Sequence, residues 1–133
     1  MAARHVEKVI GVEVIRDAVH DAIVNAKYNK IQNTYFYHAD AGEFMSEMAE
    51  EKQHVDIVFM DPPRAGSDFR FLSSMIKLSP KKIVYISCNL ETQARDLIQL
   101  VQAGYRVKAL QPVDMFPHTN HVENIALLFR QEV

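Results

Sequence analysis

Three side chains that can do acid–base or nucleophilic chemistry stand beside apolar runs of this sequence. Cys88, the only cysteine, follows the run 83–86 and precedes a helix-like segment. Asp61 comes directly after the apolar run that ends at Met60, and Glu123 stands just before the last run. Open α/β sheets carry their reactive groups at the carboxyl ends of their strands. We therefore expect a thiol and two carboxylates to share one cleft, where a thiolate can act as nucleophile and a carboxylate as base.

Cys88 taken alone has two interpretations. A single cysteine cannot form an internal disulfide or a site made of several thiolates, and a lone cysteine at the end of a core strand is more often a small buried hydrophobe than a nucleophile. Asn89, however, can cap a helix over 90–102, and the positive end of that helix would then favour the thiolate form of the neighbouring sulfur. The motifs around Cys88 favour its interpretation as a nucleophile.

A rigid turn and a loop hold the other candidates. Asp61 precedes two prolines, which donate no backbone hydrogen bond and restrict each other, so its carboxylate is held at the strand end. His118, His121 and Glu123 have the types of metal ligands, but they lack the helical register that makes a metal motif persuasive. We expect no metal, with Glu123 as a general base and the two histidines as scaffold.

Short β-branched runs alternate with amphipathic stretches from Val9 onward, which is typical of a parallel sheet covered by helices. Two nearly continuous apolar runs, 55–60 and 83–86, predict the centre of the sheet. In the last helix, spacings of three and four residues predict an inward-facing stripe. Its members are Leu90, Ala94, Leu97, Ile98 and Val101. The expected elements are strand 9–14, helix 16–29, strand 34–39, helix 41–51, strand 55–60, helix 68–78, strand 82–87, helix 90–102, strand 105–113 and strand 124–130.

Length and composition set further bounds. The chain has 133 residues, of which 48% are hydrophobic and 24% charged, as in one compact globular domain. It has no apolar stretch of the roughly 18 residues that span a bilayer and no secretory signal, so we expect a cytoplasmic protein without a membrane partner. Its formal charge of −2 predicts weak binding to nucleic acid by this chain alone, since such affinity rests largely on cationic contacts to phosphate.

Two longer motifs connect these residues. The first reads DPPRxG from Asp61 to Gly66, then sixteen residues, then IVYxSCNxxT from Ile83 to Thr92. The second reads VDxFPHTxHVE from Val113 to Glu123. Together they resemble the signatures of the S-adenosylmethionine-dependent RNA 5-methyluridine (uracil-C5) methyltransferases, which act on ribosomal or transfer RNA. The resemblance covers nearly the whole chain, from about Val9 to Phe129.

The resemblance implies a fold, a cofactor and a role for each candidate residue. The fold would be a Rossmann-like class I methyltransferase fold, with a mostly parallel sheet and an antiparallel last strand. Cys88 would be the nucleophile that adds to uracil C6, and Glu123 the base that removes the C5 proton. Glu13 would bind the ribose of S-adenosylmethionine, Asp61 would contribute to the same cofactor site, and Asp40 would lie near the adenine.

The chain also departs from that family. It lacks the glycine-rich first strand of the fold, as well as the upstream RNA-binding barrel and the iron–sulfur cluster that many members carry. We therefore expect residues 1–133 to be a single truncated catalytic domain that binds cofactor weakly and transfers no methyl group alone. Omitting that strand leaves two strand edges open, and we favour a homodimer over direct pairing of the two strands as the way to cover them.

Two other function classes remain open from the sequence: a different nucleobase methyltransferase, acting on cytosine C5 or on an exocyclic amine, and a non-catalytic module. A cytosine-C5 methyltransferase shares the thiolate step, although those acting on RNA usually use two cysteines. Enzymes that methylate exocyclic amines also place Asp-Pro-Pro at a strand end, but they need no thiol and usually continue with an aromatic residue where Arg64 stands here. A non-catalytic module that keeps the fold for assembly is the alternative outside enzymes.

Overall fold

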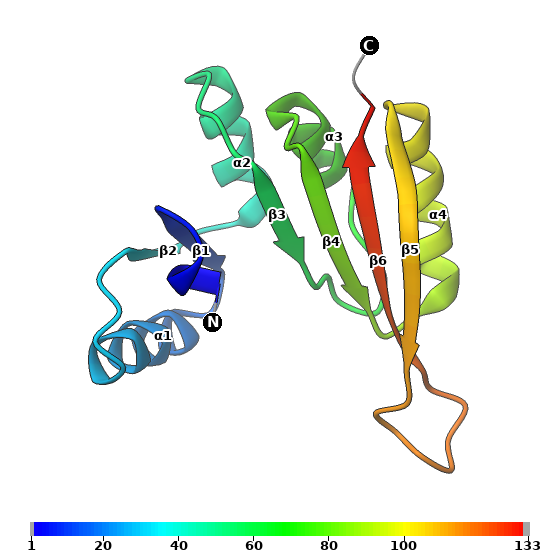
Figure 1. The fold of residues 1–133 in the computed structure, drawn as a ribbon, viewed down its shortest axis with the longest axis horizontal. Coiled ribbons are helices and arrows are strands. Elements are labelled where there is room, and N and C mark those ends of the chain that lie inside the picture. Colours follow the sequence, from blue (N-terminus) through cyan, green and yellow to red (C-terminus); the bar gives the residue numbers. More distant parts are fainter. Residues whose placement is uncertain (1, 132–133) are drawn as a thin grey trace. The chain divides into compact units, whose positions relative to one another are not determined.

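The computed structural model describes residues 2–131 and divides into two compact units (Figure 1). The first unit ends at Phe44 and the second begins at Met45. Helix α2 (Ala41–Glu50) contains this division. Among the described residues, no helix combines the length and the apolar character that crossing a membrane requires.

The first unit is a strand–helix–strand motif. After a short 3-10 helix, η1 (Ala2–Arg4), come β1 (Val9–Glu13), α1 (Arg16–Tyr28) and β2 (Thr34–His38). β1 and β2 are parallel, with Glu13 paired to His38 at their carboxyl ends. A side chain at Gly11 would stand 2.7 Å from the Phe36 ring, so the glycine lets the ring pack directly on the β1 backbone.

The second unit is a four-stranded sheet in the order β3-β4-β6-β5. Its elements are β3 (Ile57–Met60), α3 (Phe69–Leu78), β4 (Lys82–Ser87), α4 (Leu90–Gln102), β5 (Tyr105–Val113) and β6 (Glu123–Arg130). β3 and β4 are parallel, whereas β6 runs antiparallel to both of its neighbours. Figure 1 shows α3 and α4 on the same face of this sheet. The buried positions alternate along the strands, as expected for a sheet packed on one face.

Helix starts follow the sequence closely in this unit. Asp68 caps α3 by accepting a hydrogen bond from the Phe71 amide at 2.7 Å. Asn89 caps α4 by accepting from the amide of Glu91 at 3.0 Å and from that of Thr92 at 3.5 Å. The cap expected at Asn89 is therefore confirmed, and it sets the start of the helix directly after Cys88.

The predicted inward stripe of the last helix is wrong. Three of its members are largely exposed: Leu90 at 50%, Ile98 at 59% and Val101 at 48%. The buried face of α4 carries Gln93, Asp96 and Leu100 instead. The polar pair is tolerated there because its amide and carboxylate groups find hydrogen-bond partners on the sheet and the adjoining turn, which a hydrophobic count does not register.

The fold class expected from the sequence is confirmed, with parallel strand pairs followed by an antiparallel β6. All ten expected elements are present and their ends differ by no more than two residues. The largest shift is at β3, which begins at Ile57 rather than at residue 55. Within the described chain, β1 has β2 as its one neighbour and β3 has β4, so each leaves one strand edge unpaired.

Candidate active site at the carboxyl ends of the strands

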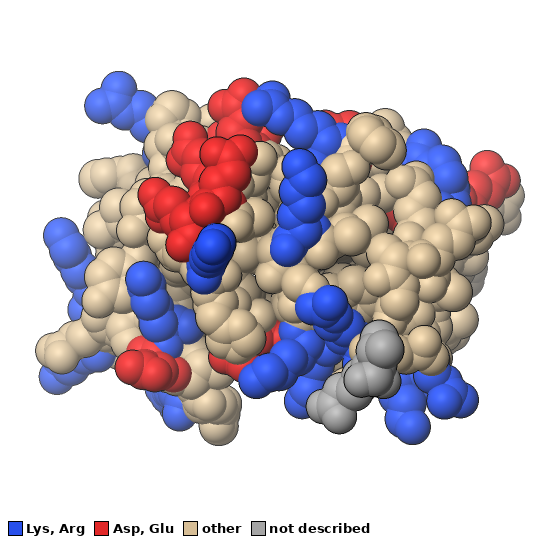
Figure 2. Space-filling view, turned by 90° about the horizontal axis from the view of Figure 1, so that it is seen from above, with Lys and Arg blue, Asp and Glu red and all other residues tan. Residues whose placement is uncertain are grey.

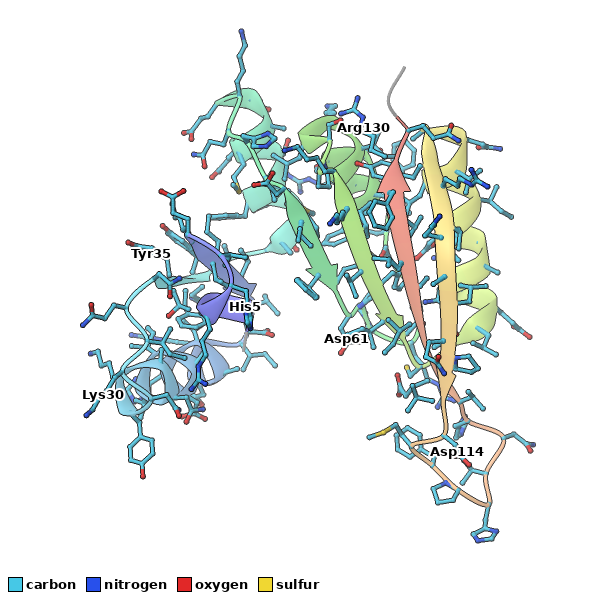
Figure 3. All side chains as sticks on the ribbon, in the orientation of Figure 1. His5, Lys30, Tyr35, Asp61, Asp114 and Arg130 are labelled. Carbon is cyan, nitrogen blue, oxygen red and sulfur yellow. The ribbon has the colours of Figure 1, made fainter. Side chains whose placement is uncertain are left out.

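The candidate residues of the second unit gather at one edge of its sheet. β3, β4 and β5 point in the same direction, so their carboxyl ends lie at the edge where β6 begins (Figure 1). Asp61 follows β3, Cys88 follows β4, and Glu123 is the first residue of β6. Figure 3 shows the labelled Asp61 and Asp114 at this edge. The thiol and the two carboxylates thus lie at the same edge of this sheet, and their sharing of one cleft stays a prediction.

Strand register places Cys88 and Glu123 next to the same residue pair. The last pair of the antiparallel β4–β6 ladder is Ser87 with Asn124. Cys88 follows the first member of this pair and Glu123 precedes the second, so both flank the same end of the ladder. Ser87 and Asn124 are buried on the face that packs on the helices. Because side chains alternate along a strand, Glu123 belongs to the opposite face of the sheet.

A hollow of about 230 Å³ opens beside the thiol. It is lined by Arg64, Cys88, Phe116 and His121, and the Cys88 side chain is half-buried. The Arg64 guanidinium contacts the His121 ring and lies 3.3 Å from its Nε2 atom. The hollow therefore combines a sulfur nucleophile with a cation and an aromatic face, all supplied by the two sequence motifs. Glu123 follows the lining residue His121 by two positions but does not itself line the hollow.

The turn that carries Arg64 is fixed to the first two turns of α4. The Arg64 carbonyl accepts hydrogen bonds from Asn89 Nδ2 at 3.1 Å and from Thr92 Oγ1 at 3.3 Å. Arg95 Nη2 donates to the Ala65 carbonyl at 3.2 Å. Asn89 thus has two functions, since its side chain both caps the helix and holds the turn. These bonds explain why the two halves of the first motif occur together.

Gly66 is required in this turn for two reasons. Its φ of +80° lies in the region that side chains disfavour. In addition, an added Cβ would stand 2.5 Å from Arg95 Nη2 and 2.9 Å from Thr92 Cβ. The glycine therefore permits the close contact between the turn and α4.

A buried carboxylate, that of Asp96, connects α4 to β4 and to the turn that carries Arg64. Asp96 is fully buried and accepts hydrogen bonds from the Ser67 amide at 2.8 Å, from Tyr85 Oη at 2.8 Å and from Arg95 Nε at 2.9 Å. Burial and the adjacent carboxylate raise the pKa of Tyr85, so its hydroxyl remains a donor. Sequence reasoning missed both Asp96 and Gln93. The available signal was their spacing with Leu100, three and then four residues, which defines a second helical stripe.

The first unit carries the two remaining candidates at its own sheet edge. Glu13 ends β1, and its Oε1 accepts a hydrogen bond from the Ile15 amide at 2.9 Å. Asp40 lies just beyond β2, and its Oδ1 accepts from the Glu43 amide at 2.9 Å. Both side chains are exposed at the carboxyl ends of adjacent parallel strands. The sheet of this unit thus presents two fixed carboxylates, an arrangement suited to the hydroxyl and amine groups of a nucleoside.

His118 and His121 lie in the loop that joins β5 to β6. Between residues 2 and 131, no group of three or more His, Cys, Asp or Glu side chains is placed to hold a metal ion. His118 has a φ of +65°, and Thr119 Oγ1 donates a 2.7 Å hydrogen bond to the Phe116 carbonyl within this tight loop. These features fit histidines that belong to the loop scaffold.

Curated relatives resemble the chain along nearly its whole length. It is 47% identical over 127 residues to an uncharacterized RNA methyltransferase of Bacteroides thetaiotaomicron, covering 95% of this chain and 28% of the relative. It is 46% identical over 132 residues to an uncharacterized RNA methyltransferase of Chlorobaculum tepidum, covering 98% and 27% respectively. The chain therefore spans less than a third of the length of these relatives.

Solved structures agree with this relationship. The Pyrococcus abyssi tRNA (uracil-54, C5)-methyltransferase, in complex with S-adenosyl-L-homocysteine, matches with 34% identity and a TM-score of 0.76, over 96% of this chain and 29% of that protein. NSun6 from Pyrococcus horikoshii matches with a TM-score of 0.69 over 95% of this chain and 42% of that protein, but at 13% identity it shows the fold alone. The model of the tRNA (uracil-5-)-methyltransferase family matches residues 1–131, and the chain belongs to that family.

Proposed function

We propose that the protein methylates C5 of a uracil in ribosomal or transfer RNA through a covalent bond between Cys88 and C6 of the base. One observation carries this proposal: Cys88 and Glu123 flank the last residue pair of the β4–β6 ladder, and the thiol borders a hollow lined by Arg64, Phe116 and His121. A nucleophile and a base at one strand end suit a reaction that begins with addition and ends with proton removal.

The reaction begins with the thiolate of Cys88, because uracil C5 is a poor nucleophile on its own. The sulfur forms a bond to C6, and the electrons of the C5–C6 double bond move toward the C4 carbonyl oxygen to give an enolate. The start of α4, capped by Asn89 directly after Cys88, places a helix amino terminus beside the residue that carries the sulfur. The adduct makes C5 electron-rich.

S-adenosylmethionine, when bound, supplies a sulfonium methyl group to C5 and leaves as S-adenosylhomocysteine. The Glu123 carboxylate then takes the proton from C5. The electrons of that C–H bond re-form the C5–C6 double bond and expel the Cys88 thiolate, which restores the enzyme and releases 5-methyluracil. Between residues 2 and 131, no side-chain hydrogen bond or ion pair engages the Glu123 carboxylate, so its oxygens remain available for the proton.

The exposed carboxylates of the first unit fit the nucleoside part of that cofactor. Glu13 would accept from the ribose hydroxyls, since only its Oε1 is engaged, by the Ile15 amide. Asp40 would lie near the adenine, and Asp61, at the end of β3, would complete the cofactor residues. We further propose that both units serve a single catalytic domain, with nucleoside recognition in the first and the reacting residues in the second.

The RNA substrate needs more cationic contacts than this chain supplies. The formal charge is −2, and the face shown in Figure 2 carries a group of acidic side chains as well as scattered basic ones. The chain also spans only 28% of its Bacteroides relative. We propose that RNA is held mainly by parts of the protein beyond residues 1–133, that these residues alone transfer no methyl group, and that alone they pair with a second copy through an open strand edge.

A covalent trap tests the proposed function. RNA in which 5-fluorouridine replaces uridine should give an adduct with the full-length protein that survives denaturing electrophoresis, because fluorine at C5 cannot leave as a proton. Cys88→Ala should abolish the adduct. As a folding control, Tyr105→Phe removes a buried hydrogen bond to the Pro80 carbonyl at the other end of the sheet and should form the adduct normally. An adduct that persists in Cys88→Ala would exclude this mechanism.

A further inference from the structure

We infer that Gln93 and Asn124 form a buried positioning pair that holds β6, which begins with Glu123, against β4 and α4, between which Cys88 lies. This inference rests on the proposed function, because it assigns the pair to the proton-removal step of that reaction. Neither residue contacts the reacting atoms in this proposal. Both act through Glu123, which directly precedes Asn124 in β6.

The pair joins three elements at the end of the sheet that carries the site. Gln93 lies on α4 and is 2% exposed, and Asn124 lies on β6 and is 7% exposed. Gln93 Nε2 donates to the Tyr85 carbonyl of β4 at 3.1 Å and to the Asn124 carbonyl at 3.2 Å. Asn124 Nδ2 donates in return to Gln93 Oε1 at 2.6 Å. One amide therefore contacts both strands at once, and its partner completes the link.

The location of these bonds suits a role in fixing the position of Glu123 relative to Cys88. Cys88 lies one residue before the cap of α4, and Glu123 lies one residue before Asn124. The link thus connects the helix that follows the nucleophile to the strand that starts with the base. The Tyr85 hydroxyl also joins β4 to α4 through Asp96, whereas the Gln93–Asn124 link connects α4 to β6 as well as to β4.

Energetics also argue against a purely stabilising role. Burying two amides costs desolvation, and replacing both partners of a buried polar pair by apolar groups of similar shape is often nearly neutral for stability. An apolar pair would therefore hold the helix on the sheet about as well. What the amides add is direction, because hydrogen bonds fix orientation and distance where apolar contacts do not.

Orientation matters most for the last chemical step. Proton removal requires the Glu123 carboxylate to reach the C5 proton within hydrogen-bond distance while the sulfur is still bound to C6. A displacement of about 1 Å from a mutation outside the chemistry can slow such a step by up to about a hundredfold. Addition of the thiolate precedes this step and does not use Glu123. Loss of the pair should therefore leave addition intact and slow release.

The experiment compares three variants of the full-length protein: Gln93→Met, Asn124→Leu and the double variant. Gln93→Met leaves the Asn124 amide without its acceptor, Asn124→Leu leaves Gln93 Oε1 without its donor, and the double change removes both side-chain amides. We expect both single variants to lower the melting temperature and the double variant to melt above Gln93→Met but below wild type, because the Tyr85 and Asn124 carbonyls still lose the Gln93 donor. In all three, kcat on uridine RNA should fall about tenfold or more, with KM for RNA changed by less than about threefold.

A second measurement separates positioning from folding. On ordinary uridine RNA, the variants should accumulate an adduct in which sulfur remains on C6 and C5 bears both the methyl group and its proton. Wild type and the Tyr105→Phe control should show little of it. On 5-fluorouridine RNA, all of these proteins should form the trapped adduct at similar rates.

The outcomes are distinct. If wild type forms no adduct on 5-fluorouridine RNA, the proposed function fails, and the inference about the pair fails with it. If wild type forms the adduct but kcat of the double variant recovers together with its melting temperature, the pair is merely structural. A fall in kcat without accumulation of the uridine adduct would also overturn the positioning role, whereas accumulation in the double variant, together with trapping of 5-fluorouridine RNA at the wild-type rate, supports it.

Discussion

At the scale of single residues, substitutions of Cys88 and of Glu123 should have opposite effects on the amount of covalent RNA adduct. Glu123→Gln keeps the size of the side chain but cannot take a proton. Because thiolate addition comes first, this variant should accumulate the adduct on ordinary uridine RNA, while kcat falls by about 10²–10⁴. Quenched time points on denaturing gels measure both. Glu91→Gln, at an exposed carboxylate in the first turn of α4, is the control and should turn over normally. Normal turnover by Glu123→Gln would remove it as the base.

Gly66 offers a second prediction at this scale. Gly66→Ala combines an unfavourable positive φ with a Cβ placed 2.5 Å from Arg95 Nη2. Gly104→Ala is a matched control, since φ there is +95° and nothing lies within 4 Å of the added Cβ. Backbone strain of roughly 1–2 kcal/mol is common to both. Gly66→Ala should therefore lower the free energy of unfolding further than Gly104→Ala and should also reduce kcat, because the turn that presents Arg64 must move. Equal losses in both variants would show that the contact with α4 is unimportant.

At the scale of elements, local signals in the sequence account for most of the fold. The helix that begins after Asn89 and the one that begins after Asp68 were predictable because capping side chains act within three residues of themselves. The inward face of α4 was not predictable in the same way. Gln93 and Asp96 are buried with hydrogen-bond partners that include Asn124, 31 residues from Gln93, and Ser67, 29 residues from Asp96. The candidate reacting residues were proposed from the two motifs, whereas the hydrogen bonds of Gln93 and Asp96 could be identified only in the assembled sheet.

The link between β4 and α4 predicts a stability effect. Tyr85→Phe removes the hydroxyl that donates to the buried Asp96 carboxylate, at a cost of about 1–3 kcal/mol because a buried acceptor loses a partner. Tyr105→Phe loses a hydrogen bond to a neutral carbonyl and should cost less, about 0.5–1.5 kcal/mol. Urea unfolding of both variants measures the difference. Equal costs would indicate that the negative charge of Asp96 adds nothing to the bond.

The same hydroxyl gives the protein a pH dependence at the alkaline end. Burial first, and the Asp96 hydrogen bond second, raise the pKa of Tyr85 in the folded state. A raised folded pKa contributes stability below the unfolded value of about 10, and this stability is lost as pH rises above it. The pKa of Tyr105 is raised by burial as well, so Tyr85→Phe should reduce the alkaline loss of stability without abolishing it. Unfolding free energies between about pH 8 and 11 test this, and an unchanged slope would contradict it.

At the scale of the whole molecule, the two edge strands of the four-stranded sheet differ in their protection against pairing with another chain. β5 is an edge strand of its sheet, and it carries Arg106, Lys108 and Pro112 together with a register shift between Val107 and Ala109. Charges, proline and bulges are the usual means by which edge strands avoid pairing with another chain. β3, at the opposite edge, has the sequence IVFM and none of these features, and its Phe59 is 62% exposed.

This contrast predicts where residues 1–133 associate when they are produced alone. The open edge of β3 should pair with a second copy, because unpaired backbone groups beside apolar side chains form a template for another strand. Phe59→Lys places a charge at that edge and should shift the molar mass measured by light scattering from a dimer toward a monomer. Leu110→Lys makes the same change at an exposed residue of the protected β5 edge and should leave the dimer intact. A monomeric wild-type chain, or equal dissociation in both variants, would show that the β3 edge does not mediate association.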